Sequence, residues 1–318
     1  MASKQRLSIR DKRRQRQSKG PITSNDELYE TMGGAIFKEK ASPKKVLDTK
    51  IEYVKRKRGK AIVQADYDYM IMADRFSETN VAQQLGNYRQ GMEFLAHCTL
   101  ASAEHDKIID RLKDLIYSYP NTDISSFVNK HHAMLYSWMI QNIIRVYGQK
   151  YLGTVYVLGG GIGLLPAMLL DTPLRIENIR NIDINGTCKF LADEMMKKEV
   201  LDNWKFKASS QDLFKINYEL NRLEILLPDN SISEGFNEVP GLLINTNLSH
   251  LENMETDWYE KMLPTQRKLI LVGETGDDVA HPYKNQKEFN AAYPMSYELY
   301  NGVLKVEDKQ YFMKIGMK

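Results

Sequence analysis

The sequence predicts an α/β protein in which a mostly parallel sheet, closed by an antiparallel hairpin, follows a helical region and a basic arm. Three observations support this fold class. Residues 1–67 are rich in basic and turn-forming residues, residues 68–150 carry apolar side chains at three- and four-residue steps, and residues 151–318 alternate short apolar runs with helical patterns. Because strands that alternate with helices imply right-handed crossovers, we expect the last region to form a doubly wound, mostly parallel sheet.

The arm, residues 1–67, is expected to be largely extended or disordered. Its first 20 residues hold eight Lys or Arg side chains and one acid, a net charge of +7, so the rest of the chain carries −4 of the total of +3. Such a segment has too few apolar residues to offset the entropy of folding. A nucleic acid is the partner that its basic side chains fit, through Arg10, Arg13, Arg14, Arg16, Lys55, Arg56, Lys57 and Arg58. The alternative is a solubilising tail that binds no partner.

Composition also bears on location. The chain has 318 residues and 42% hydrophobic residues, enough for a sizeable core, but no apolar run approaches the roughly 20 residues that span a bilayer. The N-terminus lacks the apolar segment of a secretory signal. Cys98 and Cys188 lie far apart and match no metal-ligand spacing. We therefore expect a cytoplasmic protein with no metal site and no membrane contact, whose oligomeric state the sequence leaves open.

The helical region, residues 68–150, contains two periodic stretches separated by Tyr119-Pro120-Asn121. Helical periodicity begins near Glu78 and runs to Ile116, and a second stretch covers residues 124–147. The aromatic and Met side chains of the second stretch are expected to pack in the core. The same holds for the neighbouring pair His131 and His132, to which we assign no chemical role.

From Tyr151 onward, the pattern predicts strands and helices in alternation. A hairpin ends the chain, because two strand-like runs flank Glu307-Asp308-Lys309. The expected strands are 155–158, 179–184, 204–208, 241–245 and 268–272, the expected helices are 164–170, 187–201 and 258–262, and the hairpin pairs 297–306 with 310–317.

A glycine-rich loop follows the first of these strands. Gly159, Gly161 and Gly163 form G-x-G-x-G between a strand and a helix, where glycines permit a tight turn and close approach of a ligand to the backbone. The NAD fingerprint is excluded because Leu164 occupies the position of its third glycine, and no Gly-Lys-Ser/Thr follows as in a Walker loop.

An acid at the end of the second strand meets another requirement of an adenosyl ligand. Asp183 lies about 20 residues beyond the loop, the separation that brings a carboxylate to a ribose diol. After the third strand, Gln211 and Asp212 are candidates for an adenine amino group. A helix N-cap is an equally good interpretation of this pair.

These motifs carry a resemblance. VYVLGGGIG, NIDINGTCKFLADEM, KASSQDL, GLLINTNLSHL and KLILVGE, followed by the hairpin, are similar in order and spacing to class I S-adenosylmethionine-dependent methyltransferases, with Rossmann-like sheets. The match covers about residues 152–318, a half that also resembles phage-encoded methyltransferase-like proteins, which would place the chain in a host cytoplasm. The resemblance implies a seven-stranded sheet and the cofactor S-adenosylmethionine.

The resemblance also implies residue roles. The donor's methionine moiety would lie on the loop from Gly159 to Gly163, its ribose on Asp183, and its adenine near Gln211 or Asp212. Three further residues would lie at the mouth of the fourth strand between methyl donor and acceptor, with His250 as base or orienter: Asn245, Asn247 and His250.

The expected function is methyl transfer to an unidentified acceptor, and two departures from the family pattern leave alternatives open. Val157 stands where many members carry an acid, which implies weaker binding, a substitute acid such as Asp171, or a ligand of another charge. No D/N-P-P-Y and no Pro-Cys pair is present, which disfavours two routes of base methylation. One alternative is a non-catalytic protein of this fold that acts as a nucleic-acid-binding or virion-associated component. Another is an aminopropyltransferase-like enzyme.

Overall fold

The computed structural model describes residues 80–98, 105–226, 232–276 and 278–318. These residues belong to one compact unit, Thr79–Lys318, which contains both helices and sheet. The basic arm, its two clusters and the expected boundary at residue 67 lie outside the described residues. The expected boundary at residue 150 coincides with the passage from the last N-terminal helix to the first strand.

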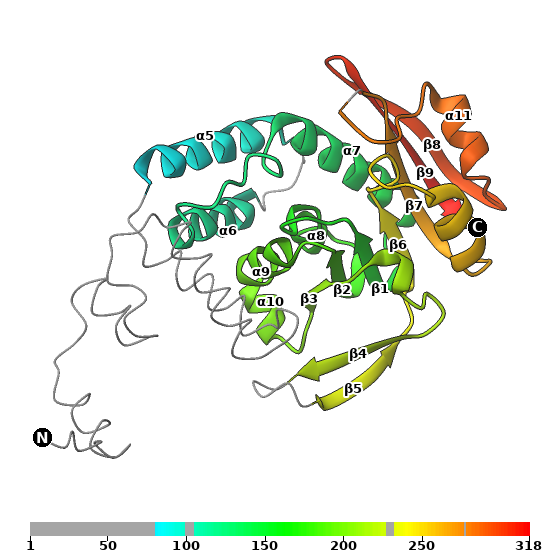
Figure 1. Cartoon of the computed structure of the whole chain (residues 1–318), viewed down its shortest axis with the longest axis horizontal. Coiled ribbons are helices and arrows are strands. Elements are labelled where there is room, and N and C mark those ends of the chain that lie inside the picture. The colour runs from blue at the N-terminus through cyan, green and yellow to red at the C-terminus, as the bar shows by residue number, and fades with distance from the viewer. Residues whose placement is uncertain (1–79, 99–104, 227–231, 277) are drawn as a thin grey trace, which may run out of the picture. The chain divides into compact units, whose positions relative to one another are not determined.

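A seven-stranded sheet forms the centre of this unit (Figure 1). The strand order is β3-β2-β1-β6-β7-β9-β8, in which β3, β2, β1, β6 and β7 are parallel and β9 is antiparallel to both neighbours. The predicted mostly parallel sheet with a C-terminal antiparallel hairpin is confirmed. The strands are β1 Tyr151–Leu158, β2 Arg175–Asp183, β3 Phe206–Ser210, β6 Leu242–Asn245, β7 Lys268–Glu274, β8 Tyr297–Val306 and β9 Lys309–Met317.

The order of the strands reverses between β1 and β6. From β1 the chain proceeds outward through β2 and β3, and it then returns to place β6 and β7 on the other side of β1. In open α/β sheets, ligands bind beyond the carboxyl ends of the strands at such a reversal. The fold therefore predicts where a site lies before any side chain is considered.

Helices precede the sheet and connect its strands (Figure 1). The α-helices are α5 Val81–His97, α6 His105–Ser118, α7 Lys130–Tyr147, α8 Leu164–Leu170, α9 Gly186–Met195, α10 Lys197–Leu201 and α11 Gln286–Ala292. Two short elements complete the set, the 3-10 helix η2 (Leu213–Lys215) and the π-helix η3 (Met254–Met262). None of the described helices is long and apolar enough to cross a membrane.

Several helix boundaries differ from the expectation, and η3 begins at Met254 rather than at residue 258. The helix expected from residue 124 begins instead at Lys130, because Asn129 caps it: its Oδ1 accepts a hydrogen bond from the backbone N–H of His132 at 3.0 Å. The helix expected over residues 187–201 is interrupted at Met196, whose φ of −107° and ψ of 29° separate α9 from α10.

Two elements were not predicted. The chain between β3 and β6 forms an antiparallel ribbon of β4 (Asn221–Leu226) and β5 (Ile232–Glu238), a separate two-stranded sheet. A further helix, α11, lies beside the hairpin strands β8 and β9 (Figure 1). The ribbon is tied to the main sheet by Arg180 of β2, whose guanidinium donates to both carboxylate oxygens of Glu238 at 3.0 and 2.7 Å.

A large aromatic cluster fills one side of the sheet. Trp258 and Tyr259 of η3 pack there with Phe289 of α11 and with sheet residues such as Tyr156 and Phe312. The indole of Trp258 is fully buried and donates to the hydroxyl of Tyr218 at 2.9 Å. Trp258 and Tyr259 are therefore core residues, and neither lines a surface on which an acceptor could stack.

Candidate functional site

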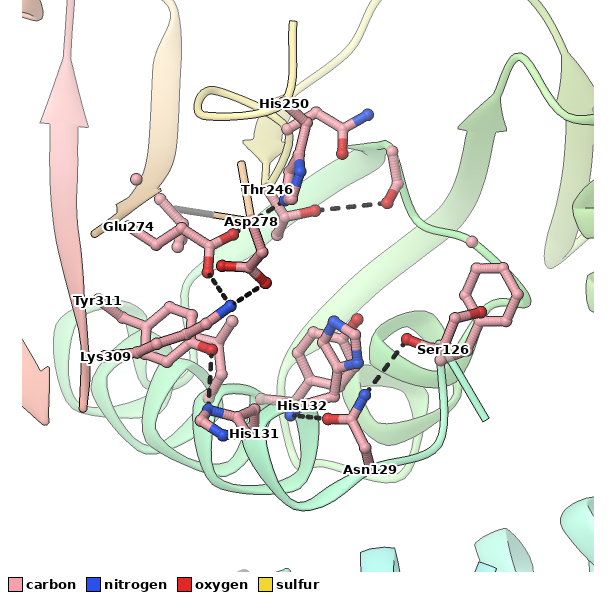
Figure 2. A pocket seen from close by; sticks show the side chains of 18 of the residues that line it. Ser126, Asn129, His131, His132, Thr246, His250, Glu274, Asp278, Lys309 and Tyr311 are labelled. Atoms are coloured by element: carbon pink, nitrogen blue, oxygen red, sulfur yellow. Dashed lines mark hydrogen bonds and ion pairs between the residues drawn. The ribbon is translucent and has the colours of Figure 1, made fainter. Parts of the chain in front are cut away.

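A cavity of about 520 Å³ lies at the carboxyl ends of the central strands, where the strand order reverses. Its residues come from segments far apart in the sequence (Figure 2). The glycine loop, the end of β2, the turn after β6 and the end of β7 supply one part, and the start of α7 and the start of β9 supply the other. The cavity therefore lies between the sheet and the N-terminal helical region.

The glycine loop needs its glycines for two reasons. Gly159, Gly161 and Gly163 have φ values of 68°, 52° and 84°, a conformation that favours glycine. A Cβ on Gly159 would lie 2.1 Å from Cγ of Asn247, and one on Gly160 would lie 1.8 Å from Oδ1 of Asn181. Protein side chains thus occupy part of the space that the missing Cβ atoms leave.

The three glycines do not all reach the cavity. Gly159 and Gly161 line it, whereas Gly163 faces the protein interior, where a Cβ would lie 3.2 Å from that of Ala192. The ring of Phe127, which also lines the cavity, lies against Gly161, where a Cβ would be 2.8 Å from its Cδ1. The loop is therefore covered by the segment that precedes α7.

Asp183 joins the loop to the end of β2. Its Oδ2 accepts a hydrogen bond from the backbone N–H of Gly161 at 3.0 Å, and its Oδ1 accepts one from that of Asn185 at 2.9 Å. The carboxylate lines the cavity. Since each carboxylate oxygen can accept more than one hydrogen bond, Asp183 keeps capacity for a ligand hydroxyl.

The turn after β6 is shaped by Asn245. This side chain is fully buried, and its Oδ1 accepts a hydrogen bond from the backbone N–H of Asn247 at 2.8 Å. Its Nδ2 has no hydrogen-bond partner. Asn247 and His250 line the cavity, but Asn245 lies behind them. The structure therefore brings Asn247 and His250 to the site and gives Asn245 the position of a support.

Charged side chains gather on the β7 side of the cavity (Figure 2). The Nε2 atom of His250 lies 2.9 Å from Oε1 of Glu274, and Nζ of Lys309 lies 3.6 Å from Oε2 of the same carboxylate. The same ammonium group lies 2.5 Å from Oδ2 of Asp278. Its hydrogen bond lowers the pKa of Asp278 below the usual range.

The start of α7 forms the opposite wall. Nδ1 of His131 lies 3.2 Å from the hydroxyl of Tyr311, and the ring of His132 stacks on Tyr136 at 5.3 Å between centroids. Burial lowers the pKa of His132 to about 4, although the Glu274 carboxylate and the Phe127 backbone oppose the shift. Burial also raises the pKa of Tyr136. Near pH 7 both rings are uncharged.

Three residues that the sequence singled out do not line the cavity, although the backbone N–H of Gln211 donates to the carbonyl of Asp183 at 3.2 Å. Asp212 caps the 3-10 helix η2, because its Oδ1 accepts from the backbone N–H of Phe214 at 3.0 Å, and it and Gln211 do not line the cavity. Asp171 pairs with Arg111 of α6 at 3.1 Å and lies at the end of α8. The expectation that Asp171 replaces the acid missing at the buried Val157 is therefore wrong.

Several residues of the cavity were not singled out from the sequence. Glu274 had a recognisable signal, since KLILVGE ends in an acid directly after a buried strand, as NID does at Asp183. Lys309 and Tyr311 are placed by the hairpin turn, and His132 and Tyr136 by the start of α7. Those positions depend on pairing between segments over 100 residues apart, which periodicity does not report. In the described part of the chain, no group of three His, Cys, Asp or Glu side chains could hold a metal ion.

Comparison with known proteins gives structural likenesses only. No family model and no curated protein matches the sequence. Magnesium protoporphyrin IX methyltransferase from Synechocystis PCC 6803, crystallised with bound SAM, is 12% identical, with a TM-score of 0.42 over 69% of this chain and 100% of that one. The N-methyltransferase NodS from Bradyrhizobium japonicum WM9, in complex with S-adenosylhomocysteine, is 11% identical, with a TM-score of 0.41 over 66% and 98%. Geranyl diphosphate C-methyltransferase from Streptomyces coelicolor A3(2) is 8% identical, with a TM-score of 0.41 over 62% and 82%.

Proposed function

We propose that the chain binds S-adenosylmethionine in this cavity and transfers its methyl group to an acceptor. One observation carries the proposal. At the reversal of strand order, the glycine loop after β1 and the carboxylate after β2 line the same cavity and are joined by the hydrogen bond from Gly161 to Asp183. A bare loop beside a strand-end acid is the arrangement that an adenosyl ligand requires from an open α/β sheet.

The residues present fit this cofactor in several respects. A cavity of about 520 Å³ lies within the usual range for a ligand of this size. Asp183 can accept hydrogen bonds from the ribose hydroxyls, and the backbone at Gly159 and Gly161 admits the methionine moiety. Ile184 follows Asp183 directly and is 73% exposed, which offers an apolar surface to the adenine. Val157 is apolar and fully buried, so the donor's ammonium group finds no carboxylate at that position.

The chemistry asks little of the protein. The bound cofactor supplies a methyl group that its sulfonium already activates, so the protein's part is to align the acceptor and to take its proton where one is lost. His250 is the candidate base, because Glu274 holds its Nε2 at 2.9 Å and thereby favours the tautomer whose Nδ1 carries the lone pair. Asn247, beside the glycine loop, is the candidate orienting residue.

Calorimetric titration tests the proposed cofactor. Wild-type protein is titrated with S-adenosylmethionine and S-adenosylhomocysteine beside two variants, Asp183→Ala and the control Asp202→Asn, which removes an exposed carboxylate at the end of α10. We expect both ligands to bind wild type and control with micromolar affinity. Binding to Asp183→Ala should be at least about tenfold weaker, because the ligand loses its hydrogen bonds to a charged group. Absence of binding by a folded sample that contains no copurified cofactor would sink the proposal.

The two alternative functions give different results in the same titration. Tighter binding of decarboxylated S-adenosylmethionine than of S-adenosylmethionine would indicate aminopropyl transfer. Binding of nucleic acid by a protein that binds neither donor would indicate a non-catalytic component of this fold.

A further inference from the structure

The charge of the cavity bears on the acceptor. Among the residues that the structure describes, the carboxylates of Asp183, Glu274 and Asp278 line it, against one lysine, Lys309. That lysine is already shared between two of the acids, at 3.6 Å from Glu274 and 2.5 Å from Asp278. The three carboxylates and the lysine together carry a net charge of −2.

One histidine of the cavity does not offset this charge, and the other two each face a carboxylate. His132 is uncharged near pH 7, because burial lowers its pKa to about 4. Its Nδ1 is buried in the wall of the cavity without a hydrogen-bond partner. The other two histidines already face carboxylates of their own, His250 facing Glu274 at 2.9 Å and His131 facing Glu307 at 3.4 Å.

The uncharged part of the lining is aromatic. The rings of Phe127, Tyr136 and Tyr311 line the cavity with His132. Burial raises the pKa of both tyrosines, and the nearby Glu274 carboxylate raises it further, so their hydroxyls remain protonated. Aromatic faces beside carboxylates attract cations through the ring quadrupole as well as through the full charges.

We propose that the acceptor is a small amine, held as its cation between the aromatic wall at the start of α7 and the carboxylates of Glu274 and Asp278. The proposal rests on the proposed function and extends it to the class of substrate. It excludes acceptors that carry phosphate or carboxylate at the reacting end, nucleic acids among them. Size agrees with charge, because one cavity of about 520 Å³ has to hold both donor and acceptor.

An ammonium ion has no lone pair, so it must lose one proton before it reacts. His250 is placed to accept that proton on Nδ1, since its Nε2 faces Glu274. The nitrogen lone pair then forms the bond to the methyl carbon, and the carbon–sulfur bond breaks with its electron pair on sulfur. The products are the methylated ammonium ion, the neutral thioether and a protonated imidazole beside a carboxylate.

A matched probe series tests the proposal without knowledge of the natural acceptor. Benzylamine, benzyl alcohol and benzoate have one ring and differ in charge, and their dissociation constants are measured by ligand-observed NMR on protein saturated with S-adenosylhomocysteine. We expect benzylamine to bind at least about tenfold more tightly than benzoate, with benzyl alcohol between them. Equal binding of the three probes, tighter binding of benzoate, or no binding of benzylamine would overturn the proposal.

Variants of the cavity acids test which carboxylates produce the preference for the cation. Glu274→Gln and, separately, Asp278→Asn each remove one negative charge, and each is expected to reduce the preference for benzylamine by about threefold or more. Glu177→Gln makes the same charge change on an exposed side chain of β2, outside the cavity lining, and should leave the preference intact. An unchanged preference in both cavity variants would overturn the proposal even if wild type favours the cation.

The failure of this proposal can be told from that of the proposed function. If S-adenosylhomocysteine does not bind, the proposed function fails, and the same probe series on the ligand-free protein still decides the charge preference. If it binds and the probes show no preference for the cation, only the acceptor class is wrong.

Discussion

At the scale of single residues, the packing around the glycine loop shows that a glycine can leave room either for a ligand or for a neighbouring side chain. At Gly159 the side chain of Asn247 fills the space that a Cβ would need, and at Gly161 the ring of Phe127 does so. Both glycines also have positive φ. The loop is thus bare partly to accept neighbouring side chains, and these neighbours lie where they can touch a ligand of the cavity. A glycine-rich motif in a sequence does not distinguish these uses.

His132 gives a prediction about the pH dependence of stability. Its folded pKa of about 4 lies below the ordinary value of 6.5, so the unfolded chain binds its proton more readily. The contribution of the uncharged His132 side chain to stability is therefore fully present above pH 6.5 and is lost as the pH falls toward 4. At pH 5, proton uptake by His132 in the unfolded chain lowers the free energy of unfolding of the wild-type protein by about 2 kcal/mol.

Urea unfolding at pH 7.5 and pH 5.0 measures this contribution. His132→Gln should lose about 2 kcal/mol less than wild type between the two pH values. The control is His281→Gln, at an exposed position. Equal losses in wild type and His132→Gln would show that the buried imidazole does not set this part of the pH dependence.

At the scale of elements, a buried ion pair holds the β4–β5 ribbon to the main sheet. The side chains of Arg180 and Glu238 are 5% and 10% exposed, and the hydroxyl of Tyr156 also donates to Glu238, at 3.1 Å. Arg180 donates in addition to the backbone carbonyl of Trp204 at 2.7 Å. This network of hydrogen bonds links β1, β2 and β5. From β5 the chain continues into β6 and the turn that lines the cavity.

Removal of one partner leaves a buried charge without compensation. We predict that Glu238→Ala lowers the free energy of unfolding by about 3–5 kcal/mol, because the guanidinium of Arg180 would then be stranded. Equilibrium unfolding in urea provides the measurement. Glu177→Ala, on an exposed position of β2, is the control and should change stability by less than about 1 kcal/mol. A loss below about 1 kcal/mol in Glu238→Ala would mean that the ribbon is held by other contacts.

The elements also show how far the sequence alone can go. The run from Val155 to Leu170 was predictable because a buried strand, a glycine turn and a helix leave three different local patterns. The helix start expected over Leu164–Leu170 coincides with α8. The ribbon was not, because β4 and β5 are stabilised by the distant Arg180 rather than by a strong pattern of their own. The start of α7 was misplaced because the cap at Asn129 competes with continued helical periodicity.

The candidate site was predictable to the same extent. Gly159, Gly161, Asp183, Asn247 and His250 come directly from strand ends, and a parallel sheet brings such ends together. The wall from α7 and β9 depends on where an N-terminal helix and a C-terminal hairpin pack, which local patterns do not encode. Asp171 is near the glycine loop in the sequence, but in the structure its carboxylate pairs with Arg111 of α6. Proximity in the sequence was therefore a poor guide to its role.

At the scale of the whole molecule, charge is distributed unevenly along the chain. The first 20 residues carry +7, whereas the described lining of the cavity has three carboxylates and one lysine. If the arm binds nucleic acid, as we propose, it does so apart from the chemistry of the cavity. Deletion of residues 1–20 should then flatten the salt dependence of binding to an oligonucleotide, since fewer counterions are released.

The measurement is the slope of the logarithm of the binding constant against the logarithm of salt concentration, for full-length and shortened protein. Titration with S-adenosylmethionine serves as the control, and its affinity should not change on deletion. An unchanged salt slope would assign the arm to solubility alone.

The two sides of the cavity come from different parts of the chain. The glycine loop and Asp183 belong to the sheet side of the cavity, but the facing wall comes from the start of α7, which precedes β1 in the chain. Under the proposed function, substitutions at the start of α7 would change the acceptor side of the cavity, whereas Gly159 and Asp183 lie on its sheet side. The part of the chain that precedes β1 would then set which acceptor is admitted.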